Sequence, residues 1–138
     1  MTKEEVLYKA QSFRAAFNDG AMMVMAGHIA YTQVDADYPV SLSPIFLQDI
    51  LRGQWNYDGV IITDDLEMGA LQNNFTNEEI TRLAFLAGND ILLYNSTWDK
   101  QIEAYDTILE AVQSGEISEE RLDESVRRIL KLKGEIFE

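Results

Sequence analysis

Residues Val60-Ile61-Ile62-Thr63 are the stretch that most restricts how this chain can fold. They are β-branched and mostly apolar, and Asp64-Asp65 follow directly. A continuous apolar run of this kind is typical of a parallel strand that is buried on both faces. Ligands of α/β sheets and barrels lie beyond the carboxyl ends of such strands. The two carboxylates cannot belong to an apolar core, so they need another role.

Two roles are open for this acid pair. An Asp can cap a following helix by accepting hydrogen bonds from free N–H groups, and a carboxylate at a strand tip can be catalytic. Asp64 directly continues the strand, whereas Asp65 is better placed to cap a turn running through Leu66, Met68 and Leu71. We therefore take Asp64 as the candidate catalytic group and Asp65 as the candidate cap.

Two further stretches have the composition of buried strands. Residues 21–26 and 91–94 are apolar, and helical patterns separate them from the central strand. Strands that alternate with helices imply right-handed crossovers and a parallel sheet. The fold class is therefore α/β, and residues 1–138 form one domain of three βα units plus a terminal helix.

The helices are predicted from periodicity and capping signals. Thr2 with Glu5, and Thr76 with Glu79, have the spacing of capping boxes. Apolar residues repeat at helical spacing in the first helix and in the last two. We expect these residues to face inward: Val6, Ala10, Phe13 and Phe17; Ile102, Tyr105, Leu109 and Val112; Leu122, Val126, Ile129 and Leu130. The basic residues 127–133 are expected to complement the dipole at the end of the last helix.

Three short parallel strands would leave a sheet with two open edges. Purely parallel sheets are normally covered on both faces or closed into barrels, and open apolar edges favour pairing. The chain is therefore expected either to pair with another copy or to be part of a larger polypeptide. Three of the eight βα units of a (β/α)8 barrel would explain the strand count.

The charge and the residue types exclude several kinds of partner. There are 24 acidic and 11 basic residues, a formal charge of −13, which argues against nucleic acid and anionic membranes. Cysteine is absent, so neither disulfides nor thiolate ligands are expected. Met22, Met23 and Met25 could suggest a soft metal, but packing is the commoner use of Met in a strand, and we expect no metal. No apolar run reaches membrane-spanning length, and a cytoplasmic location is expected.

Several stretches of the sequence resemble the N-terminal barrel domain of family 3 glycoside hydrolases, especially its β-N-acetylglucosaminidase branch. They are Val24-Met25-Ala26-Gly27-His28-Ile29-Ala30-Tyr31, Ser41-Leu42-Ser43-Pro44, Tyr57-Asp58-Gly59 running into the strand and Asp64-Asp65-Leu66-Glu67-Met68, Ala87-Gly88-Asn89-Asp90, and the tail from Gly115 to Lys133. The resemblance covers nearly the whole chain. It implies that the three βα units and the terminal helix correspond to the last part of the family's (β/α)8 barrel.

The resemblance also implies an activity and a site. The chain would be an O-glycosyl hydrolase that cleaves terminal β-linked N-acetylglucosamine with retention, through Asp64 as the nucleophile. The carbohydrate would be a muropeptide or a chitin fragment, His28 and Met68 would lie at the sugar, and no cofactor would be needed. The branch takes its acid/base His from an upstream Lys-His-Phe-Pro-Gly-His-Gly-like stretch, which these 138 residues do not contain.

Three alternatives stay open. His28 could orient its loop by hydrogen bonds instead of contacting sugar. The chain could be a non-catalytic half-barrel that folds or oligomerises without activity. Setting the resemblance aside, a small doubly wound domain could hold Mg²⁺ with Asp64, Asp65 and Glu67, although fold analogy is weak support for a function.

Overall fold

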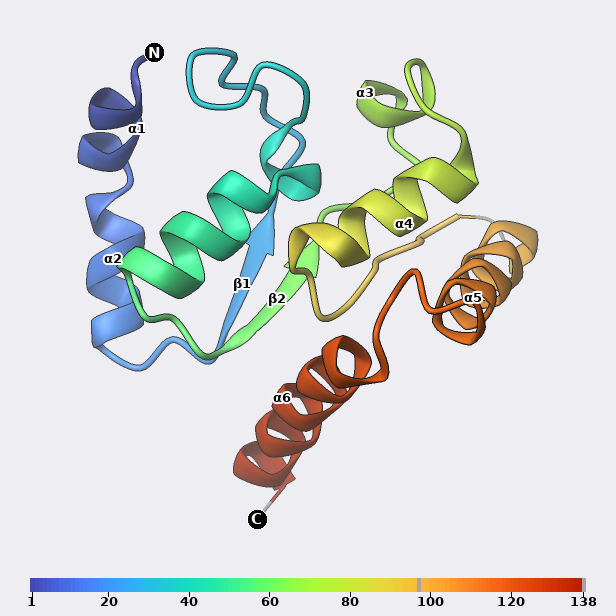
Figure 1. Cartoon of the computed structure of the whole chain (residues 1–138). Helices are drawn as coiled ribbons and strands as arrows, with labels where there is room; N and C mark the ends of the chain where they lie inside the picture. The colour runs from blue at the N-terminus through green and yellow to red at the C-terminus, as the bar shows by residue number, and fades with distance from the viewer. Residues whose placement is uncertain (97, 138) are drawn as a thin grey trace.

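The computed structural model describes residues 1–96 and 98–137. Figure 1 shows two central strands, with α1 and α2 to one side of them and α5 to the other. In chain order the elements are α1 (Lys3–Lys9), α2 (Gln11–Asn18), β1 (Met23–Ala26), the short helical segments η1 (Val40–Leu42) and η2 (Ile45–Gln54), β2 (Val60–Thr63), α3 (Gly69–Gln72), α4 (Asn77–Ala87), α5 (Trp98–Gln113) and α6 (Glu119–Phe137).

The two strands pair in parallel. The register runs from Met23 opposite Val60 to Ala26 opposite Thr63. Val60, Ile61 and Thr63 are buried, as the apolar run predicts. Strand β1 is buried less completely than β2. Met23 and Met25 share one face of β1, and both are exposed, Met25 to 53%. The prediction of a buried strand at 21–26 is therefore wrong for one of its two faces.

The predicted third strand is not confirmed, and the sheet that the described residues form has two strands. Residues 91–94 run beside β2 but make a single parallel bridge, between Ile62 and Ile91. The ladder does not continue because the N–H of Leu93 donates to the side-chain Oγ1 of Thr63 at 2.9 Å. A hydroxyl thus takes the place of a backbone carbonyl at the position where the next rung would form.

Both predicted capping boxes are confirmed, but the first helix is not continuous. Thr2 and Glu5 exchange hydrogen bonds of 2.9 and 3.3 Å, and Thr76 and Glu79 exchange bonds of 2.8 and 3.2 Å. The chain leaves helical geometry at Ala10, where ψ is 6°, so two short helices replace the one expected. Phe13, which the periodicity predicts to face inward, is 57% exposed.

The prediction for the last two helices is only partly confirmed: Val112 and Leu122 pack against a buried cluster, but several other apolar residues expected to face inward are exposed. In α5 the buried residues are Ala104, Thr107 and Ala111, whereas Tyr105 is 68% exposed. In α6 the buried residue is Ser125, and Leu130 is 62% exposed. Small buried side chains let these helices lie close to the rest of the molecule, while several large apolar side chains stay exposed. Ile102, Leu109 and Val126 are also exposed.

The basic stretch also has a different role from the one predicted. Helix α6 continues to Phe137, so residues 127–133 lie within the helix and not at its end. The interpretation through the helix dipole is therefore wrong. Arg128 instead reaches two carboxylates, Asp58 at 3.3 Å and Asp90 at 3.2 Å.

Candidate active site

The turn after β2 places the acid pair at the carboxyl end of the strand. The N–H of Asp64 donates to the carbonyl of Ala26 at 2.9 Å, and the N–H of Leu66 donates to the carbonyl of Leu93 at 2.9 Å. Leu66 is fully buried. The turn is therefore fixed on both sides, to the end of β1 and to the segment at 91–94.

The two acids have different surroundings. Asp65 Oδ1 accepts the N–H of Glu67 at 3.0 Å and that of Asn95 at 3.4 Å, so this carboxylate caps the turn. Asp64 is half-buried, and its Oδ1 accepts the N–H of Asp65 at 2.8 Å. Across residues 1–96 and 98–137, no Lys or Arg side chain forms an ion pair with Asp64. This geometry leaves the Asp64 carboxylate able to act on a ligand.

His28 lies at the same turn. Its Nε2 is 2.9 Å from the backbone carbonyl oxygen of Asp65, and its Nδ1 is 2.7 Å from the Oγ of Ser41. The ring is half-buried. Both of its nitrogens are thus engaged by the protein.

Met68 also converges on this point. Its N–H donates to the carbonyl of Asp65 at 3.1 Å, the same oxygen that His28 contacts. The Met68 side chain is 43% exposed, at the residue that precedes α3. All three residues proposed for the site from the sequence therefore contact the backbone of Asp65: Asp64 accepts its N–H, and His28 and Met68 bond its carbonyl.

The long loop between β1 and η2 delivers Ser41 to this site. Buried Asp35 organises the loop, since its Oδ1 accepts the N–H groups of Asp37 and Tyr38, each at 3.0 Å. Its Oδ2 accepts the hydroxyl of Ser43 at 2.5 Å. Sequence reasoning gave Ser41 no role. The available signal was the unusual length of the loop, because long βα loops are often functional.

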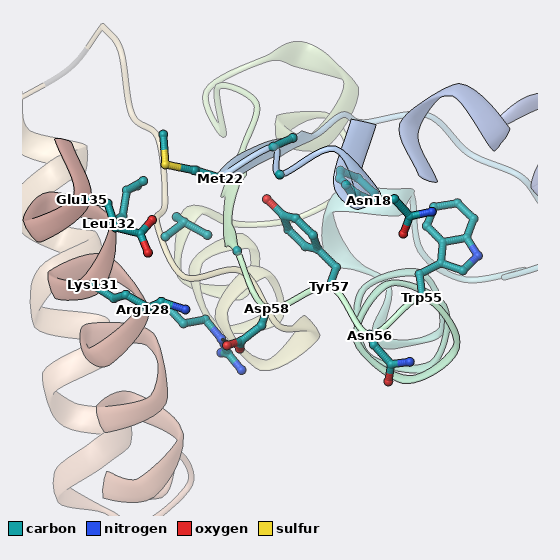
Figure 2. A pocket seen from close by; sticks show the side chains of 15 residues that line it. Asn18, Met22, Trp55, Asn56, Tyr57, Asp58, Arg128, Lys131, Leu132 and Glu135 are labelled. Atoms are coloured by element: carbon teal, nitrogen blue, oxygen red, sulfur yellow. Dashed lines mark hydrogen bonds and ion pairs between the residues drawn. The ribbon is translucent and has the colours of Figure 1, made fainter. Parts of the chain in front are cut away.

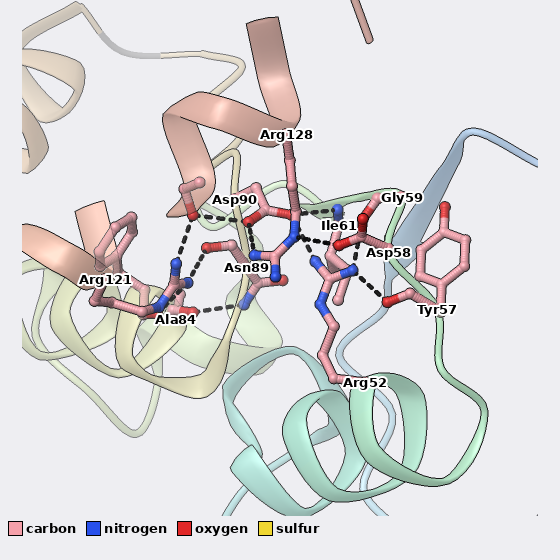
Figure 3. A network of polar contacts seen from close by, with 12 residues as sticks. Arg52, Tyr57, Asp58, Gly59, Ile61, Ala84, Asn89, Asp90, Arg121 and Arg128 are labelled. Carbon is pink, nitrogen blue, oxygen red and sulfur yellow. Dashed lines mark hydrogen bonds and ion pairs between the residues drawn. The ribbon is translucent and has the colours of Figure 1, made fainter. Parts of the chain in front are cut away.

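A second carboxylate, Asp90, lies at the opposite end of the sheet (Figure 3). Its side chain is fully buried, and its Oδ2 accepts from Arg52 at 2.8 Å and from the N–H of Ile61 at 2.9 Å. Its Oδ1 accepts from Ser125 at 2.7 Å and from Arg128 at 3.2 Å. Burial lowers the pKa of Arg52, while the negative charge of Asp90 acts in the opposite direction. In the sequence, Asp90 stands out only as part of the Ala87-Gly88-Asn89-Asp90 stretch that resembles the family.

A recess of about 250 Å³ lies near Asp58 and Gly59, at the amino-terminal end of β2 (Figure 2). Asp58, Arg128 and the ring of Tyr57 line it. The Tyr57 hydroxyl is buried without a hydrogen-bond partner among the described residues. A side chain at Gly59 would collide with this ring and with the carbonyl of Met22. The recess is separated from Asp64 by the length of β2.

Among the residues that the structure describes, there is neither a group of metal ligands nor a helix able to span a membrane. In the part of the chain that the structure describes, no three His, Asp or Glu side chains are grouped so that they could hold a metal ion. Asp64, Asp65 and Glu67 therefore do not form the Mg²⁺ pocket considered as an alternative. No described helix combines the length and the apolar character required to cross a bilayer.

The parallel βα arrangement, with a carboxylate beyond the strand that forms no ion pair within the described residues, is the architecture of α/β proteins that act at the carboxyl ends of their strands. The sequence pattern of the glycosyl hydrolase family 3 N-terminal domain matches residues 3–132. The chain therefore belongs to glycosyl hydrolase family 3, and the described elements are part of the TIM-barrel-like fold of that domain.

The chain is also similar to individual members of the family. A β-N-acetylglucosaminidase of Paenibacillus sp. str. FPU-7 superposes with a TM-score of 0.93 and 38% identity, over 97% of this chain and 26% of that chain. A β-N-acetylglucosaminidase/β-glucosidase of Cellulomonas fimi is 31% identical over 90% of this chain and 23% of its own length. A β-hexosaminidase of Neisseria gonorrhoeae is 40% identical over 59% of this chain and 22% of its own length. The chain thus spans about a quarter of these relatives.

Proposed function

We propose that the chain carries the nucleophile of a retaining β-N-acetylhexosaminidase, and that this nucleophile is Asp64. The observation that carries the proposal is the half-buried Asp64 carboxylate at the carboxyl end of β2, which forms no ion pair with the described residues. Membership of a glycosidase family supports it, as do relatives named as N-acetylglucosaminidases and hexosaminidases.

The reaction would follow the two steps of retaining glycosidases. The ionised Asp64 attacks the anomeric carbon while the glycosidic oxygen leaves with a proton from a general acid. Water then attacks the glycosyl–Asp64 ester, gives its proton to the same group, and releases the sugar with the carboxylate restored. We assign the general acid to a segment outside these 138 residues, because both ring nitrogens of His28 are already bonded to Ser41 and Asp65.

The proposed substrate is a terminal β-linked N-acetylglucosamine of a cell-wall or chitin fragment. The half-exposed Met68 is placed to offer an apolar contact to the sugar beside Asp64. For His28 the geometry favours the orienting role over direct contact, since its bonds to the protein use both nitrogens.

We further propose that residues 1–138 are the last three βα units and terminal helix of the family barrel, and that other βα units cover its apolar sides. Leu92, Tyr105 and Leu109 line a groove of about 590 Å³ along α5. Phe13 and Met25 line another of about 260 Å³ between α2 and β1. Neither groove includes Asp64 among its lining residues. Sedimentation over a range of concentrations tests the alternative, a second copy, which would give a concentration-dependent dimer.

The competing function is a half-barrel without activity, which the open grooves favour. An aryl β-N-acetylglucosaminide with an activated phenol separates the two, because such a phenol leaves with little help from an acid. We expect a burst of phenol of up to one equivalent per folded chain, absent from Asp64→Asn. A folded chain that gives no burst would establish the non-catalytic half-barrel and overturn the catalytic proposal.

A further inference from the structure

We propose that His28 is a positioning residue: as the neutral tautomer that carries its proton on Nε2, it holds the carbonyl of Asp65, the residue whose N–H bonds the Asp64 carboxylate, and thereby aims that carboxylate. This inference rests on the proposed function, because it assigns His28 a task for the nucleophile. Both nitrogens of the His28 ring are hydrogen-bonded to the protein itself, Nε2 to Asp65 at 2.9 Å and Nδ1 to Ser41 at 2.7 Å.

The hydrogen-bond partners determine the tautomer. The carbonyl oxygen of Asp65 can only accept, so Nε2 of His28 must carry a proton. In the neutral ring the other nitrogen is then an acceptor, which matches the hydroxyl of Ser41 as donor. A doubly protonated ring would need Ser41 to accept, and no second acceptor for the serine proton lies among the described residues.

The bonded carbonyl belongs to the residue whose N–H holds the nucleophile. Asp65 donates its N–H to Oδ1 of Asp64 at 2.8 Å, and its carbonyl accepts from His28 and from the N–H of Met68. The N–H and the carbonyl belong to successive peptide units that meet at the Cα of Asp65, so a displacement of this residue would disturb both sets of contacts. His28 therefore acts on Asp64 through one residue, and the direction of the carboxylate depends on that bond.

Ser41 in turn is held by the interior of the molecule. It is fully buried, its N–H donates to the carbonyl of Gly27 at 3.1 Å, and its carbonyl accepts from Asn89 Nδ2 at 2.8 Å. The carbonyl of Asn89 accepts from Arg121 at 2.8 Å. A continuous series of hydrogen bonds thus connects α6 with the turn that carries Asp64.

Two variants separate the bonds of the ring. In His28→Gln the side-chain amide can still donate to the Asp65 carbonyl from the position of Nε2. In His28→Asn the shorter amide reaches Ser41 but not Asp65. We expect the burst rate constant to stay within about threefold for His28→Gln and to fall at least about tenfold for His28→Asn, the scale of one lost hydrogen bond. Ser12→Ala, an exposed serine of α2, is the control for unrelated changes.

Nitrogen-15 spectra test the inference without any turnover. His28 is the one histidine of the chain, so its ring signals need no assignment. At neutral pH we expect a protonated Nε2 and an unprotonated Nδ1, and faster hydrogen exchange at the amides of Asp65 and Met68 in His28→Asn but not in His28→Gln. A proton on Nδ1, or equal exchange in both variants, would overturn the inference. If the unmodified chain gives no burst, the proposed function fails while these spectra still decide the role of His28.

Discussion

Asp90 and Asp64 stand at opposite ends of the same pair of strands, and the protein treats them differently. Asp90 has a fully buried side chain that two arginines, a serine hydroxyl and a backbone N–H surround. Asp64 is half-buried, and its carboxylate accepts a hydrogen bond from the adjacent N–H of Asp65. The charge of Asp90 is neutralised inside the protein, whereas that of Asp64 has no ion-pair partner among the described residues.

This difference assigns Asp90, at one end of β2, to stability and Asp64, at the other end, to the proposed reaction. In barrels built of βα units, residues at the amino-terminal end of the strands serve stability, and reactive groups lie at the carboxyl end. A carboxylate that attacks carbon must be ionised but not tied to a cation. The contrast predicts that the two acids respond in opposite ways to the same substitution.

The largest effect is expected for Asp90→Asn. Arg52 and Arg128 would remain partly buried without their anion, and removal of one member of a buried ion pair costs about 3–5 kcal/mol. Urea denaturation measures the free energy of unfolding, with the exposed Asp123→Asn of α6 as the matched control. If Asp90→Asn lowered the free energy of unfolding by less than about 1 kcal/mol, Asp90 would not have the stabilising role that distinguishes it from Asp64.

The next largest effect is a loss of stability at alkaline pH through ionisation of Tyr94, which lies near the acidic residues Glu67 and Asp65 of the turn after β2. Burial raises the pKa of Tyr94 from 10.0 to about 12, and Glu103, Glu67 and Asp65 act in the same direction. The neutral phenol is favoured in the folded state, so its contribution is complete below pH 10 and is lost as the pH rises through about 12. We expect a decrease of roughly 2 kcal/mol over that interval.

Tyr94→Phe is the control for this alkaline loss. The Tyr94 hydroxyl donates to Thr81 at 2.6 Å, because the Thr81 hydroxyl donates to the Asn77 carbonyl. The variant therefore starts from a lower stability, but its curve between pH 10 and pH 12 should be flatter than that of the unmodified chain. Parallel curves would show that Tyr94 does not titrate in this range.

A smaller effect is expected for Asp65→Ala. The substitution removes the oxygen that accepts the N–H groups of Glu67 and Asn95, and loss of such a cap costs about 1–2 kcal/mol. Asp65→Asn keeps an oxygen at this position and should cost less. Thermal and urea unfolding of both variants measure this order of stabilities. An Asp65→Ala variant as stable as the unmodified chain would contradict the capping role of Asp65.

The smallest effect on stability is expected for Asp64→Asn. The amide oxygen can still accept the N–H of Asp65, and the described residues include no cation that loses a partner. The free energy of unfolding should change by less than about 0.5 kcal/mol, while the phenol burst disappears. A stability loss as large as that of Asp65→Ala would show that Asp64 is structural.

The features that the sequence predicted correctly are local ones. The run Val60–Thr63 is a buried strand of the observed sheet, and the Thr76–Glu79 capping box forms, because each depends on residues a few positions apart. The turn role of Asp65 follows from the same kind of local geometry.

The features that the sequence did not predict depend on long-range packing. Periodicity located the apolar stripe with Tyr105 and Leu109 on α5, but it could not show that the small residues would face inward. The network at Asp90 joins residues 38 positions apart, and the missing third strand depends on one hydroxyl, that of Thr63. None of these has a signature within a window of neighbouring residues.

The most direct test of Asp64 as the nucleophile is covalent labelling by a fluorinated N-acetylglucosaminyl fluoride, followed by intact mass and peptide mapping. The fluorine slows the second step, so the glycosyl–enzyme accumulates. We expect one sugar per chain, on the peptide that contains Asp64, and none on Asp64→Asn. A label on another residue, or none on a chain shown to be folded, would contradict the assignment.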